Sequence, residues 1–77
     1  MTDFPRITRN PAVMGGKACI RGMRVTVGMI LGNLAEGETI EDLLRLYPYL
    51  EREDILEAIR YGAWLASVRE VELDPAA

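Results

Sequence analysis

Three stretches between residues 26 and 71 repeat apolar side chains at helical spacing, and two short breaks separate them. Within each stretch the apolar residues recur at steps of three or four, which places them on one face of a helix. The first stretch holds Val27, Ile30, Leu31 and Leu34, the second Ile40, Leu43, Leu44 and Tyr47, and the third Ile55, Leu56, Ile59 and Ala63. Short amphipathic helices bury such faces against one another, so the sequence predicts a mainly α, three-helix bundle of the helix-turn-helix type.

Residues at the ends of these stretches predict where the helices begin and end. Thr26 is suited to cap the first helix. Thr39 is suited to begin the second, and Asp42 three residues later completes a variant of the capping box. Pro48 forces the second helix to end just before it. The third helix is expected to span residues 51–70.

The first 25 residues have no helical pattern, because prolines and glycines interrupt them. These residues are Pro5, Pro11, Gly15, Gly16 and Gly22. Residues 18–21 and 23–26 flank Gly22 and predict short strands. A two-stranded hairpin is marginal in water by itself, so these strands must pair with something, and another copy of the chain is one candidate.

The 77 residues are expected to form one domain, with an extended or β arm (residues 1–25), a three-helix bundle (residues 26–71) and a tail (residues 72–77). Histidine is absent and Cys19 is the one cysteine, which excludes disulfide frameworks, cysteine-rich zinc sites and histidine-based catalytic triads. We expect Cys19 to be a packing residue and predict no catalytic residue, cofactor or metal site. A lone cysteine without a signal peptide indicates the cytoplasm, and no apolar run is long enough to span a membrane.

The net charge of −3 is distributed unevenly along the chain. Residues 1–25 carry five cations and one acid, a net charge of +4, whereas residues 26–77 carry four arginines and eleven acids, a net charge of −7. A basic arm on an acidic body indicates two surfaces with different partners, or copies of the chain that attract each other head to body. Because a core this small often needs a partner to be stable, we expect a homodimer.

The third predicted helix has more apolar residues than one core needs. At 100° per residue, one group is expected to face the other two helices: Ile55, Leu56, Ile59, Ala63 and Ala66. A second group centres on nearly the opposite side and includes the only tryptophan, a residue type that anchors interfaces. We predict a partner or dimer interface at Tyr61, Trp64, Leu65 and Val68. The alternative is that the N-terminal segment of the same chain covers this group.

In a helix-turn-helix protein the N-terminal part of the last helix enters the major groove of DNA. Here this part is acidic, and it would meet repulsion from phosphates. Its four acids are Glu51, Glu53, Asp54 and Glu57. If DNA is bound, the contacts are expected from Lys17, Arg21, Arg24 and Arg52. The alternatives are that the helices share only the architecture, or that the carboxylates form an enzyme's metal site. The simplest interpretation of these carboxylates is a solvated helix start.

The run from Arg6 to Val27 resembles one particular protein family. Its distinctive part is Gly15-Gly16-Lys17-Ala18-Cys19-Ile20-Arg21-Gly22-Met23-Arg24, and it continues through Leu34-Ala35-Glu36-Gly37, Ile40-Glu41-Asp42-Leu43-Leu44, Tyr47-Pro48-Tyr49-Leu50 and Glu53-Asp54-Ile55. Over residues 6–66 the chain is similar to small prokaryotic proteins of the domain-of-unknown-function family 433. It departs from the family pattern at Ala18, where proline is frequent, and at Glu51, where threonine or serine is frequent.

This resemblance implies a homeodomain-like three-helix fold with an N-terminal strand segment, often dimeric. Some members of the family are regarded as antitoxins of type II toxin–antitoxin pairs, encoded beside a nuclease-like toxin of the PIN type. Such antitoxins typically bind their toxin and the operator DNA of their own operon. The implied function is therefore an antitoxin-like regulator without catalysis, whose partners are a second copy, a PIN-like toxin and operator DNA. The alternative is a protein-interaction module that never binds DNA.

Overall fold

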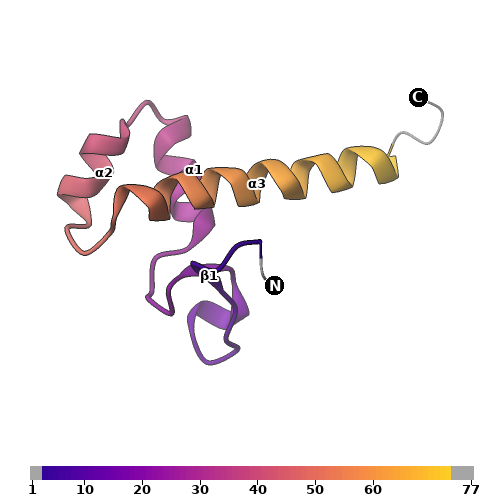
Figure 1. Ribbon diagram of the computed structural model, residues 1–77, viewed down its shortest axis with the longest axis horizontal. Helices are drawn as coiled ribbons and strands as arrows, with labels where there is room; N and C mark the ends of the chain where they lie inside the picture. Colours follow the sequence, from indigo (N-terminus) through magenta and orange to yellow (C-terminus); the bar gives the residue numbers. More distant parts are fainter. Residues whose placement is uncertain (1–2, 74–77) are drawn as a thin grey trace.

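A short two-stranded sheet precedes three helices in the computed structural model, which describes residues 3–73 (Figure 1). The elements are β1 (Ile7–Thr8), η1 (Met14–Gly16), β2 (Cys19–Ile20), α1 (Val27–Ala35), α2 (Ile40–Leu46) and α3 (Arg52–Leu73). The predicted class, mainly α with a short N-terminal β segment, is confirmed. The helices occupy the three stretches in which the apolar spacing is helical.

The predicted starts of α1 and α2 are confirmed by their capping bonds. The hydroxyl of Thr26 accepts a hydrogen bond from the Met29 N–H at 3.0 Å. At the start of α2, the Thr39 hydroxyl accepts from the Asp42 N–H, and the Asp42 carboxylate accepts from the Thr39 N–H. These bonds satisfy backbone donors that have no partner within the helix.

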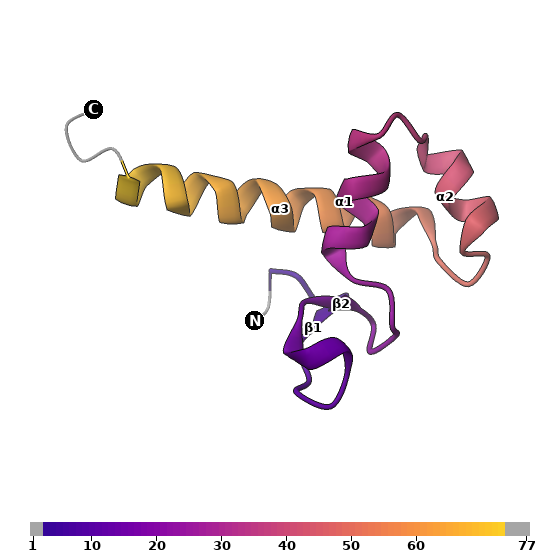
Figure 2. The same ribbon diagram turned by 180° about the vertical axis from the view of Figure 1, so that it is seen from behind.

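The third helix is longer than its sequence pattern predicts. It runs to Leu73, past the expected end at residue 70, so residues 72–73 are helical and do not belong to a tail. Residues 74–77, the rest of the predicted tail, lie outside the described part of the chain. The second half of α3 projects beyond the other elements in both ribbon views (Figures 1 and 2). No helix within residues 3–73 combines the length and the apolar character needed to cross a membrane.

The strands of the arm pair within the chain, but the strand predicted at residues 23–26 is wrong, because only an isolated bridge from Thr26 to Cys19 forms there. β1 and β2 are antiparallel, and Ile7 lies opposite Ile20 in the register. After β2 the chain reverses at Arg21 and Gly22, whose φ angles of 45° and 74° are both positive, as a type I′ turn requires. The Met23 N–H closes this turn by donating to the Ile20 carbonyl at 2.8 Å.

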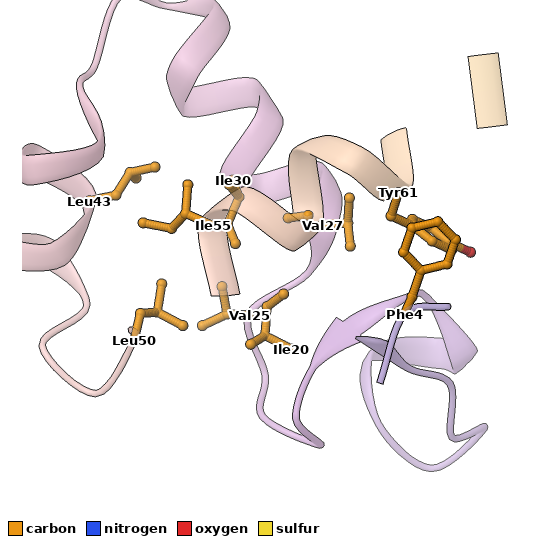
Figure 3. Packing of buried hydrophobic residues seen from close by; sticks show 10 residues of the cluster. Phe4, Ile20, Val25, Val27, Ile30, Leu43, Leu50, Ile55 and Tyr61 are labelled. Carbon is orange, nitrogen blue, oxygen red and sulfur yellow. The ribbon is translucent and has the colours of Figure 1, made fainter. Parts of the chain in front are cut away.

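The main core lies between the three helices and the returning arm. Its central side chains are Ile20, Val25, Ile30, Leu43, Leu50 and Ile55, and Figure 3 shows them gathered in one group. Two of them belong to the arm, so the arm is part of the folded core. Cys19 is buried beside them, which confirms its predicted role as a packing residue.

The predicted core face of α3 is wrong beyond its first turn. The side chains buried against the body are Asp54, Ile55, Glu57, Ala58 and Tyr61. Ile59, expected in the core, is 37% exposed, and Ala63 and Ala66 are exposed as well. The apolar pattern misleads here because two carboxylates occupy the core face.

The stripe predicted on the opposite side of α3 instead continues this core face. At 100° per residue, Trp64, Leu65 and Val68 fall within roughly 80° of the direction of Asp54. The helix therefore carries one face that packs on the body in its first half and extends past the body in its second half.

Candidate functional site

A buried carboxylate lies where the arm meets the start of α3. The Asp54 side chain has no exposed surface and accepts hydrogen bonds from two arginines of the arm. Arg6 Nη1 lies 2.8 Å from Asp54 Oδ1, and Arg21 binds both carboxylate oxygens, with Nε at 3.0 Å and Nη2 at 2.8 Å. Asp54 also accepts the Glu51 N–H at 2.8 Å and thereby caps the helix start. One side chain thus joins both strands, at the end where Arg6 and Arg21 lie side by side, to α3.

The backbone at Arg21 is adapted to this contact. A positive φ is uncommon for a residue other than glycine and costs free energy. In this conformation the guanidinium reaches Asp54 and also donates to the Tyr49 carbonyl at 3.1 Å. The ion pair therefore fixes the turn and connects it to the chain just before α3.

The surroundings of Asp54 set its protonation. Burial raises the pKa of this carboxyl, but the hydrogen bonds from Arg21, from the Glu51 N–H and from Arg6 outweigh burial and lower the pKa from 3.8 to about 2. Asp54 is consequently ionised at neutral pH, and its charge is balanced by two cations.

A second buried carboxylate, Glu57, accepts the backbone N–H of Arg6. Two of the four acids at the start of α3, Asp54 and Glu57, are therefore buried. The interpretation as a solvated helix start is wrong for these two residues. Within the described residues no group of three or more acidic or cysteine side chains is arranged to hold a metal ion. The carboxylates are occupied by hydrogen bonds that hold the arm in place.

The four cations predicted to contact DNA have different surroundings. Arg21 is bound to Asp54, and Arg52 pairs with Glu41 at 2.9 Å, a contact that lowers the pKa of Glu41. Lys17 and Arg24 are exposed and form no ion pair within the part of the chain whose side chains are described, residues 3–68. The proposed DNA contact of all four stays a prediction.

The predicted interface on α3 is corrected at Tyr61. Its side chain is only 2% exposed, because Phe4 packs on it edge to face at 5.2 Å and Arg9 Nη2 donates to its hydroxyl at 2.6 Å. Figure 3 shows the Phe4 and Tyr61 rings together, apart from the aliphatic core. The N-terminal segment therefore covers the first part of the predicted interface, as the alternative interpretation expected.

The rest of the predicted interface is open to solvent. Trp64 is 44% exposed, although the Phe4 ring lies 5.8 Å from it, and Val68 is 40% exposed. Leu65 between them is also exposed. We call these three residues the α3 stripe. They are the part of the core face that extends beyond the body.

A groove opens beside the α3 stripe, between α1 and α3. It has a volume of about 610 Å³. Its walls include Gly28, Met29 and Leu31 of α1, Tyr61, Gly62 and Leu65 of α3, and Lys17 and Thr26 from the chain before α1. We call it the α1–α3 groove. Sequence analysis missed it, because no single motif marks a hollow formed by two helices and a loop.

Glycine at position 62 brings α1 and α3 together beside this groove. A Cβ atom at Gly62 would lie 2.6 Å from Leu31 Cδ1, closer than carbon atoms pack. By contrast, a Cβ at Gly28 would meet only the Thr26 hydroxyl at 3.8 Å, and a Cβ at Gly32 would have no atom of the described chain within 4 Å. Gly28 therefore leaves the groove wall open from the side of α1.

Comparisons with known proteins give a consistent result. The family model described as "Protein of unknown function (DUF433)" matches residues 7–62. The uncharacterized protein y4eO of Sinorhizobium fredii is 34% identical over 56 residues, which are 73% of this chain and 25% of that protein. The chain thus spans about a quarter of the length of that curated relative.

A solved structure extends the similarity to three dimensions. The crystal structure of a DUF433 member protein from Anabaena variabilis is similar with a TM-score of 0.72 and 29% sequence identity. The match covers 94% of this chain and 69% of that one. The three-helix arrangement with its N-terminal strands is therefore shared with an experimentally determined structure.

The first prediction concerns the buried ion pair. Asp54→Asn keeps the size of the side chain but removes the charge that balances Arg6 and Arg21, so we expect the free energy of unfolding to fall by about 2 kcal/mol. This loss of stability is smaller than is usual when one partner of a buried ion pair is removed, because both guanidinium groups still reach water. Urea denaturation measures it. Glu53→Gln, a change at an exposed neighbour, is the control and should cost at most about 0.5 kcal/mol.

The second prediction follows from the lowered pKa of Asp54. The ionised carboxylate stabilises the folded state, so its contribution is complete above pH 3.8 and is lost as the pH falls toward 2. Urea denaturation of the wild type across this range should show that the free energy of unfolding falls as the pH is lowered. Asp54→Asn should show a smaller decrease. Equal pH dependence in the two proteins would contradict the assignment.

Proposed function

The chain belongs to the DUF433 family, and we propose that it is a non-catalytic, antitoxin-like regulator that acts by binding another protein chain through the α3 stripe. The observation that carries this proposal is the position of the stripe. The core face of α3 continues past the body as Trp64, Leu65 and Val68, where nothing within the described residues covers it fully.

The composition of the stripe supports a protein partner. Contiguous exposed apolar side chains are uncommon on a monomer and mark sites of interaction. A tryptophan in such a stripe offers a large contact area, and residues of this type contribute much of the binding energy in interfaces. Phe4 holds one side of the Trp64 ring, so the ring is partly ordered before a partner arrives.

The charge of the chain supports a nuclease of the PIN type as one partner, which the family resemblance also implies. Residues 26–77 have a net charge of −7. Nucleases bind RNA phosphates through cationic surfaces, and an acidic protein competes favourably for such a surface.

DNA binding, the second activity that the resemblance implies, has less support from the geometry. Two of its four expected cations, Arg21 and Arg52, are paired with carboxylates of the same chain. The exposed start of α3 pairs Arg60 with Glu53, which leaves this surface without excess positive charge. Phosphate contacts need such an excess.

The third prediction tests the α3 stripe. Trp64→Glu places a charge in the proposed interface, so we expect affinity for the protein partner to fall about 30-fold or more. The measurements are co-purification with the product of the adjacent gene and molecular mass by light scattering. Ser67→Glu, on the side of α3 that faces away from the body, is the matched control and should bind like the wild type.

Circular dichroism of both variants should match the wild type, because Trp64 is 44% exposed and lies outside the cluster of buried core residues. If Trp64→Glu bound every partner as tightly as Ser67→Glu, the α3 stripe would have no role in association and the proposed function would fail.

The fourth prediction concerns DNA. Since only Lys17 and Arg24 are without a carboxylate partner among the four, we expect weak binding to the DNA upstream of the operon. The logarithm of its binding constant should fall against the logarithm of salt concentration with a slope of about −2 per chain. A slope of about −4 would mean that Arg21 and Arg52 leave their carboxylates to contact phosphates.

A further inference from the structure

The α1–α3 groove has the size and lining of a pocket for a small organic molecule. Its volume of about 610 Å³ lies within the range of roughly 300–1,000 Å³ that is typical of such pockets. Its apolar walls come from α1 and α3 and include Leu31 and Leu65. Lys17, Thr26 and Gly28 line it beside the start of α1, and no acidic side chain of the described residues lines it.

Lys17 gives this part of the groove a positive charge. The Val27 N–H donates to the Ala18 carbonyl at 2.9 Å, and this bond holds the segment that carries Lys17 beside the start of α1. Lys17 is exposed and forms no ion pair within residues 3–68. An unbalanced cation in an apolar groove favours a ligand that has a negative charge at one end.

Two uncharged donors belong to the same part of the lining. Thr26 is only 6% exposed, and its hydroxyl accepts from the Met29 N–H but donates to no acceptor within residues 3–68. The Gly28 N–H, in the first turn of α1, has no acceptor within the same residues either. Free N–H groups and the helix dipole at a helix start favour an anion. These two donors and Lys17 together suit the two oxygens of a carboxylate.

The remaining walls of the groove favour a hydrocarbon tail over a peptide. Leu31 and Leu65 have no hydrogen-bonding side chain, and their backbone N–H groups bond within their own helices. The Tyr61 hydroxyl already accepts from Arg9 Nη2 at 2.6 Å. The amide groups of a peptide would therefore be buried here without partners, at a cost in free energy. A hydrocarbon tail gains free energy when it leaves water for these walls.

We infer that the α1–α3 groove binds a small organic acid, whose carboxylate accepts hydrogen bonds beside Lys17 at the start of α1 and whose apolar tail lies between α1 and α3. This inference goes beyond the proposed function and does not depend on it, because the residues that recognise the carboxylate lie outside the α3 stripe. Leu65 belongs to both surfaces, so a bound acid reaches the edge of the stripe.

Octanoate is the probe, because it joins one carboxylate to a plain hydrocarbon chain. Isothermal titration calorimetry with the full chain measures its affinity and that of octylammonium, which has the same tail and the opposite charge. We expect octanoate to bind about tenfold or more tightly than octylammonium, since Lys17 attracts the one and repels the other. N-acetyl-leucyl-leucine, which carries a carboxylate but also two amide groups, should bind more weakly than octanoate.

Two variants with matched controls test the two parts of the site. Lys17→Met removes the charge, so octanoate affinity should fall about tenfold, whereas Arg24→Met, at an exposed cation of the arm that does not line the groove, should bind like the wild type. Gly28→Gln fills the groove from α1, where a Cβ fits without a clash, and should lower octanoate affinity about tenfold or more. Gly32→Gln is its control, because it lies on the same helix, has open space around it and does not line the groove.

Thermal unfolding followed by circular dichroism gives a second readout, because a ligand of the folded chain raises its melting temperature. Octanoate should raise it for the wild type, Arg24→Met and Gly32→Gln, and leave it unchanged for Gly28→Gln. The inference is overturned if millimolar octanoate does not bind the wild type, or if octylammonium or the leucine dipeptide binds as tightly. It is also overturned if Lys17→Met or Gly28→Gln binds octanoate as tightly as its control.

Discussion

The fold depends on one buried carboxylate. Asp54 pairs with Arg6 and Arg21, which lie side by side at one end of the β1–β2 pair, and it also caps the start of α3. Two very short strands would not hold the arm by themselves, because a sheet of this size is marginal in water. The ion pairs supply the missing attachment, and they bring Ile20 and Val25 of the arm into the core between the helices.

This arrangement changes the meaning of the charge pattern. A basic arm and an acidic helix start suggest an external partner for each, yet much of the opposite charge is paired inside the molecule. Arg6 and Arg21 are bound to carboxylates of α3 and its start, and Glu57 receives a backbone N–H of the arm. On the arm, the exposed cations Arg9, Lys17 and Arg24 form no ion pair within residues 3–68, and α3 carries an exposed apolar stripe. These surroundings are the reason why we propose binding of protein in preference to binding of DNA.

The sequence predicts the elements of the fold better than their tertiary contacts. Local rules placed the caps at Thr26 and Thr39, because such caps depend on residues only three positions apart. The predicted core face of α3 is wrong because a pattern of apolar residues cannot identify Asp54, a charged residue, as buried. The arginines that make its burial possible lie more than thirty residues away in the sequence. The burial of Tyr61 under Phe4 and the existence of the α1–α3 groove likewise depend on contacts between distant segments.

The second half of α3 projects because the rest of this small chain is too short to cover it. Its core face needs a body to pack against, and the arm and α1 are long enough to cover that face only as far as Trp64. A helix that ended there would leave no apolar stripe, whereas α3 continues to Leu73. Within residues 3–68 the side chains of this face beyond Trp64, namely Leu65 and Val68, stay exposed, and we propose that another chain covers them. On this proposal, the need for a partner follows from how far α3 extends and does not depend on which protein provides the contact.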